Sequence, residues 1–236
     1  MSILFRISEF VARTSGSALS ALVEAVRTFL GGDPELRRRV AFSIALIALS
    51  AKMAKADGVV SPNEVRAFHE IFSVPREEMR NVMRLYDLAK GDVAGFEAYA
   101  EQMAGLCGSG SRNCPMLEDI LDGLFHIAKA DGVLHEREHD FLARVADIFA
   151  ISESRYARIR ARHLAGGKSD PFLLLGVSPD TPFPEIKRRY RELVFQNHPD
   201  RLMARGVPAE FLAIANARLA ALNAAFEQIE KGWMPA

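Results

Sequence analysis

The chain has 236 residues, 49% of them hydrophobic, which is enough for two modest domains and a sizeable core in at least one of them. Its 30 Lys and Arg residues balance 30 Asp and Glu residues, so no global field attracts nucleic acid or an anionic membrane. Two cysteines, Cys107 and Cys114, are too few for a disulfide scaffold and lack zinc-site spacing, and we expect both to be reduced in a cytoplasmic protein.

The N-terminal segment, residues 1–33, has an amphipathic pattern. Apolar residues cluster near its start, but Arg6, Glu9 and Arg13 interrupt them, which argues against a signal-peptide core or a spanning helix. The later apolar stretch, residues 40–51, is also too short to cross a bilayer. We expect the segment to dock on the domain that follows. Shallow attachment to a partner or to the inner face of a membrane is the alternative.

Helical periodicity dominates the chain and predicts an all-α fold. Val40, Ile44 and Ile47 share one helical face, for example, and no run of β-branched residues bounded by turns suggests a sheet. We expect helices at about 4–13, 18–30, 34–56, 62–73, 76–90, 92–106, 115–130, 135–150, 153–165, 183–196 and 208–231.

An internal repeat lies within the helical region. The run Lys55-Ala56-Asp57-Gly58-Val59 recurs as Lys129-Ala130-Asp131-Gly132-Val133, between flanks of matching character. Each copy predicts a helix, a tight turn and a second helix, with the glycine ending the first helix in a left-handed conformation.

Acidic residues in the repeat have two interpretations. Their spacing matches the second half of an EF-hand calcium loop, but the first and third ligand positions hold Met53 and Lys55, or Ile127 and Lys129, which cannot supply oxygens. The simpler interpretation is helix capping. Glu64 would complete a capping box with Ser61, and Glu138 would do so with the poorer cap His135.

The paired turns resemble the TerB family, named for tellurite resistance, over about residues 35–150. The resemblance implies a compact helical domain whose acidic residues near the turns hold a divalent metal, the only cofactor that we consider. The positions that carry over are Asp57, Glu64, Asp131 and Glu138. An unchanged melting temperature of this domain with added calcium or zinc would exclude the metal.

A domain boundary follows the helical domain, which we place at residues 34–165. Residues 166–170, with two glycines before small polar residues, form the expected linker, and residues 171–236 form a second domain. Two helices there carry apolar stripes and are expected to pack only against each other, as an antiparallel hairpin. The stripes are Ile186, Tyr190, Leu193 and Val194 on the first helix, and Leu219, Leu222, Phe226 and Ile229 on the second.

The connecting loop of the hairpin carries His198, Pro199 and Asp200, and the helix before it is basic. Neither a nucleophile nor a set of metal ligands accompanies His198 and Asp200, so we expect no enzyme. The cations are Lys187, Arg188, Arg189 and Arg191. They form either a solvated face or a docking surface for an acidic partner.

This second domain resembles the J-domain of the DnaJ family over about residues 169–231. The resemblance rests on Asp170-Pro171-Phe172, Leu175-Gly176-Val177, Glu185-Ile186-Lys187, Tyr190-Arg191, His198-Pro199-Asp200-Arg201 and Asn223-Ala224-Ala225-Phe226. It implies binding to a DnaK-type heat-shock ATPase and stimulation of its ATP hydrolysis. The residues implied are His198, Pro199 and Asp200, which are essential in the family, and Lys187, Arg188, Arg191 and Arg201 around them.

Two positions depart from the J-domain pattern. Glu192 replaces a usual cation, and Asn197 replaces a frequent aromatic residue, so partner affinity or choice is expected to differ. Together the two domains resemble DjlA-type co-chaperones, although we do not expect the membrane span that is usual there.

The leading hypothesis is therefore a co-chaperone whose helical domain directs it to a client or site. Capture of no partner by residues 1–165 would exclude that targeting role. The alternative is a metal- or stress-responsive binding protein that acts through the TerB-like domain.

Overall fold

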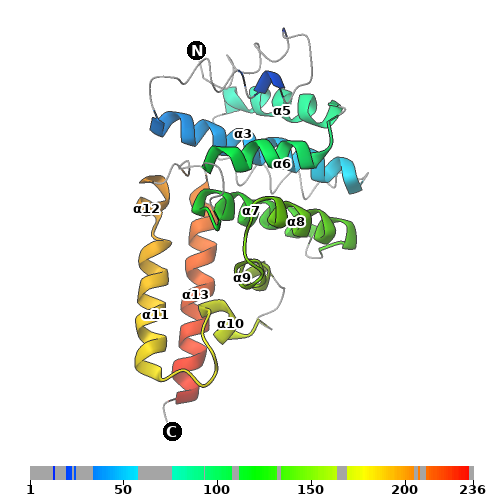
Figure 1. Ribbon diagram of the computed structural model, residues 1–236. Coiled ribbons are helices and arrows are strands. Elements are labelled where there is room, and N and C mark those ends of the chain that lie inside the picture. Colours follow the sequence, from blue (N-terminus) through cyan, green and yellow to red (C-terminus); the bar gives the residue numbers. More distant parts are fainter. Residues whose placement is uncertain are drawn as a thin grey trace.

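The computed structural model describes residues 13, 20–22, 24, 34–57, 76–92, 94–107, 112–131, 134–163, 169–204, 207 and 211–233. Within these ranges all regular structure is helical, which confirms the all-α fold (Figure 1). The helices are α3 (Pro34–Asp57), α5 (Arg76–Gly91), α6 (Phe96–Ala104), α7 (Pro115–Ala128), α8 (Glu136–Ile148), α9 (Glu153–His163), α10 (Pro171–Leu175), α11 (Phe183–Gln196), α12 (Pro199–Ala204) and α13 (Leu212–Trp233). Short 3-10 turns, η1 (Gly105–Cys107) and η2 (Lys129–Asp131), follow α6 and α7.

Several sequence predictions lie outside the described residues. They include the helix at 62–73, the Ser61–Glu64 capping box, and the left-handed glycines Gly58 and Gly132. The predicted helix at 4–13 also lies outside, apart from Arg13.

Helix α3 forms the centre of the N-terminal core. Nearly every side chain from Val40 to Ala54 is buried, as expected for a helix that is apolar on all sides. Helices α5, α6, α7 and α8 pack around it, and Ala21 and Leu22 contribute to the same core. In Figure 1 these helices stack in layers, while α11 and α13 run side by side away from the stack.

Helix α10 shows why the Asp-Pro-Phe and Leu-Gly-Val segments fold as they do. The side chain of Asp170 caps the helix by accepting a hydrogen bond from the amide of Phe172 at 2.9 Å, and Pro171 occupies the first turn. Gly176 ends the helix at φ +66°, a left-handed conformation that glycine adopts without strain.

The hairpin of α11 and α13 has its own core, which the stripes predicted. Ile186 and Leu193 pack with Leu222, Phe226 and Ile229, and residues of α10 join the same cluster. Val194 and Leu219 of the predicted stripes do not belong to it. Tyr190 stacks on Phe226 with ring centroids 4.2 Å apart, and its hydroxyl donates to Asn223 at 3.0 Å.

The expectation that the hairpin packs only against itself was wrong near its tip. Phe211 and Ile214 are buried in the N-terminal core instead, and the Phe211 ring lies edge-on to Phe42 with centroids 4.8 Å apart. At Gly123 a β-carbon would lie 3.1 Å from Leu46 and 3.4 Å from Ile214, so the glycine permits this close packing. The start of α13 therefore joins the hairpin to the helical bundle.

The cysteine prediction also needs correction. Cys107 and Cys114 form a disulfide, whereas we expected two reduced thiols. Cys107 ends the η1 turn and Cys114 directly precedes α7, and their Cα atoms are 6.3 Å apart, within disulfide range. Sequence spacing alone does not give this distance.

Candidate functional site

The His198-Pro199-Asp200 segment lies at the tip of the hairpin, between α11 and α12. Where we expected a simple loop, Pro199 begins a short helix. Proline is well tolerated in that position because a first-turn amide needs no helical partner. The tripeptide therefore sits at a junction between two helices.

The side chains of His198 and Asp200 face solvent. They are 54% and 79% exposed, with 3.6 Å between Nδ1 of His198 and Oδ2 of Asp200. The amide of Asp200 donates to the same imidazole nitrogen at 3.3 Å. These local contacts hold two polar groups together on a surface that a partner can reach.

Phe195, which the sequence analysis did not single out, lies beside the tip. Its ring is 59% exposed, and the guanidinium carbon of Arg201 lies 3.6 Å from the ring centroid. The cation–π contact places the predicted Arg201 next to an exposed apolar surface. The sequence indicates Phe195 only weakly, as an aromatic residue outside the buried stripe of α11.

The four cations of α11 do not share one environment. Arg188 and Arg191 are exposed and Lys187 is half-buried, whereas Arg189 donates through Nε to the carbonyl of Leu175 at 3.4 Å. Glu192 accepts from Arg189 at 3.3 Å and lies 4.0 Å from Arg188. The basic face predicted from sequence is therefore Lys187, Arg188 and Arg191, partly neutralised by Glu192.

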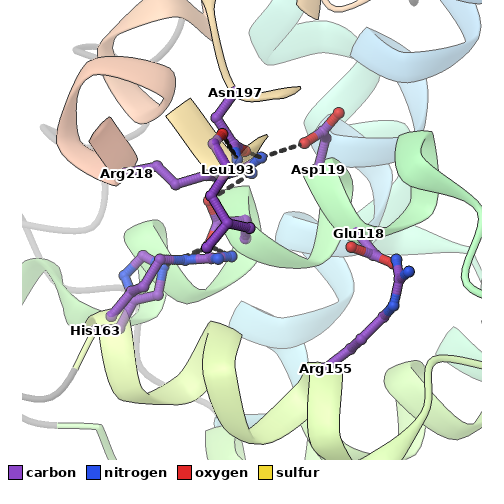
Figure 2. Close-up of polar contacts among 9 residues, drawn as sticks. Glu118, Asp119, Arg155, His163, Leu193, Asn197 and Arg218 are labelled. Atoms are coloured by element: carbon purple, nitrogen blue, oxygen red, sulfur yellow. Dashed lines mark hydrogen bonds and ion pairs between the residues drawn. The ribbon is translucent and has the colours of Figure 1, made fainter. Parts of the chain in front are cut away.

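Asn197 connects the tip to the interior. Its side-chain nitrogen donates to the carbonyl of Leu193 at 2.7 Å, and its side-chain oxygen accepts from Arg218 at 2.8 Å. Arg218, from α13, also donates to Asp119 at 2.7 Å and to Asp122 at 2.7 and 3.0 Å. Figure 2 shows Arg218 with Asn197 on one side and Asp119 on the other. Polar contacts thus run from the tip to α7.

Asp122 is the centre of this buried ionic network. Its second oxygen accepts from Arg162 at 2.9 Å and lies 2.9 Å from Nε2 of His163. Burial alone would raise the pKa of Asp122, but Arg162, Arg218 and His163 together hold it well below its usual range. Burial lowers the pKa of His163, because a buried imidazole resists becoming charged. Asp122 is therefore a buried, paired carboxylate at neutral pH.

This network was not predicted from the sequence, although a pattern for it exists. Arg218 lies four residues after Ile214 and four before Leu222, on a stripe that is otherwise buried. Asp122 lies within the apolar face of α7 in the same way. A charge on a buried stripe indicates a buried partner, but not which one.

Three of the four acidic residues proposed as metal ligands lie among the residues that the structure describes. Glu64 lies outside the described residues, while Asp57 and Asp131 are the last residues of α3 and η2. Glu138 is buried, and its carboxylate accepts from the amide of His135 at 2.9 Å, which confirms the capping interpretation. Among the residues that the structure describes, no three possible ligands are grouped for a metal. The metal remains a prediction.

Within the described part of the chain, no helix is both long enough and apolar enough to cross a membrane.

Comparison with known proteins gives one family and a group of relatives. The family model described as tellurite resistance protein TerB matches residues 43–161. Co-chaperone protein DjlA of Photobacterium profundum is 28% identical over 220 residues, which cover 82% of this chain and 78% of the relative. DjlA of Coxiella burnetii is 27% identical, with 76% and 73% covered. No solved structure matches the chain.

Proposed function

The chain belongs to the TerB family, and we propose that it acts as a J-domain co-chaperone. It binds a DnaK-type heat-shock chaperone and stimulates that partner's ATP hydrolysis, without a reaction of its own. The similarity to proteins named co-chaperone over most of the chain supports the general role. The observation that carries the finer proposal is the exposed His198-Pro199-Asp200 tip beside the basic face of α11.

The basic face and the tip have different tasks in this proposal. The exposed cations of α11 attract an acidic surface of the chaperone and orient it, which mainly raises the association rate. His198 and Asp200 then contact the ATPase at the end of the hairpin. The side chains of Phe195 and Arg201 supply an adjoining apolar and cationic contact.

The N-terminal bundle fixes the orientation of the tip before binding. Asn197 and Arg218 tie the end of α11 to α7, and Phe211 anchors the start of α13 in the bundle core. A preorganised tip loses less conformational entropy on binding.

We extend the proposal to client or site selection by the bundle, and to a location in the cytoplasm or at the inner face of the membrane.

Charge reversal at Arg191 tests the docking face. We expect Arg191→Glu to lower the association rate with an ATP-loaded DnaK-type chaperone by about tenfold at low salt, since an attractive charge becomes repulsive. Stopped-flow binding at several salt concentrations measures this. Arg144→Glu, an exposed reversal on α8, is the matched control and should leave the rate nearly unchanged. Equal rates for both variants would contradict the proposed face.

A further inference from the structure

A cavity of about 310 Å³ lies between the bundle and the hairpin. Helices α7 and α9 form one side, and α10, α11 and α13 form the other. Its volume is at the lower end of the range for small-molecule sites. Five arginines line it: Arg155, Arg158, Arg162, Arg189 and Arg218.

Four of these arginines already have partners. Arg155 pairs with Glu118, and Arg162 and Arg218 both pair with Asp122. Arg189 donates to the carbonyl of Leu175 and pairs with Glu192.

Arg158 differs from its neighbours. Among the described residues, no carboxylate or carbonyl accepts a hydrogen bond or ion pair from its guanidinium. Its side chain lies against Gly176, where an added β-carbon would be only 2.8 Å from the Nη1 atom. The guanidinium thus packs over a glycine that leaves room for it.

The surroundings of Arg158 oppose its charge. Burial lowers the pKa of Arg158, and the like charges of Arg189, Arg155 and Arg162 lower it further, with only Glu118 acting in the other direction. This arrangement disfavours folding of the free protein. Unfavourable electrostatic interactions of this kind are common where like charges are held together to bind a ligand.

We propose that this cavity binds a small soluble organic phosphate, with its phosphate group on Arg158. A planar guanidinium donates two parallel hydrogen bonds to phosphate oxygens, and the bound anion would relieve the repulsion among the arginines. Arg155 of α9 and Arg189 of α11 also line the cavity, so their charges would add to the attraction for an anion. Leu174, Leu193 and Leu222 also line the cavity and would contact the organic part of the ligand.

A ligand in this position would bridge the bundle and the hairpin. Arg158 belongs to α9, whereas Arg189 belongs to α11. The last residue of α11, Gln196, and its C-cap, Asn197, also line the cavity. Binding would therefore strengthen the attachment of the hairpin. This inference does not depend on the chaperone partner.

The test uses the full chain, with pyrophosphate as the probe and sodium chloride at matched ionic strength. At a hundredfold excess over its Kd, pyrophosphate should raise the melting temperature by about 5 °C. Arg158→Ala should abolish the rise, and Arg158→Lys should keep part of it, because a charge remains without the planar fork. Arg160→Ala, an exposed position on the same helix, should behave as wild type.

Titration calorimetry on the wild-type chain gives a second readout that needs no variant. We expect pyrophosphate to bind at one site per chain, and Arg158→Ala to weaken binding at least about tenfold, the loss of one charge-assisted contact. No measurable binding to wild type, or equal effects of pyrophosphate and sodium chloride, would overturn the proposal. A wild-type response in Arg158→Ala would do so as well.

Discussion

Replacing Arg218 by methionine is expected to lower the free energy of unfolding by about 3–5 kcal/mol, because it leaves buried carboxylates without their main cation. Asp119 and Asp122 are 5% and 1% exposed, and both accept hydrogen bonds from this guanidinium. Methionine keeps an unbranched apolar chain but lacks the guanidinium, so the loss reflects mainly the missing charge and hydrogen bonds. Urea unfolding at pH 7 measures the change.

Arg144→Met is the matched control for this experiment, since it removes an exposed arginine from a helix. It should change the free energy of unfolding by no more than about 0.5 kcal/mol. The pairing of Arg218 also raises the pKa of that guanidinium: burial opposes the charge, but Asp122 and Asp119 outweigh burial. A loss below about 1 kcal/mol in Arg218→Met would show that the network contributes little to stability.

Phe211→Ala is expected to lower the free energy of unfolding by about 3–5 kcal/mol. The ring is 1% exposed and lies against Phe42, so truncation leaves a cavity where the hairpin enters the bundle core. Because this contact joins the two parts, the variant should also separate their unfolding. Thermal unfolding followed by calorimetry would then show a broadened or divided transition.

Phe195→Ala provides the comparison for Phe211→Ala. The same atoms are removed, but from a ring that is 59% exposed, so the cost should be less than about 1 kcal/mol. If both substitutions cost the same, Phe211 does not anchor the hairpin.

Sequence patterns predicted the helices well because the patterns are local. Helix α11 spans Phe183–Gln196, the range expected from the sequence, and α7 begins at Pro115 as expected. The hairpin core followed from apolar spacing on α11 and α13. His198 and Asp200 were placed at its tip for the same reason.

The contacts between the two parts could not be predicted in this way. A stripe shows that Ile214 is buried, but not that its neighbour is Gly123 of a distant helix. Arg218 and Asp122 are 96 residues apart, so their pairing depends on tertiary packing. Asn197 stood out in the sequence as a departure from the J-domain pattern, and its bond to Arg218 supplies a physical role for it.

The action of the hairpin tip on another protein's ATPase is the core of the proposed function. Single-turnover ATP hydrolysis by a DnaK-type chaperone, with and without this protein, measures it most directly. We expect wild type to raise the rate by about tenfold or more, equivalent to about 1.4 kcal/mol or more of the barrier. His198→Gln should abolish the rise without changing the melting temperature, because the side chain faces solvent. Equal stimulation by both proteins, or stimulation by neither, would contradict the claim.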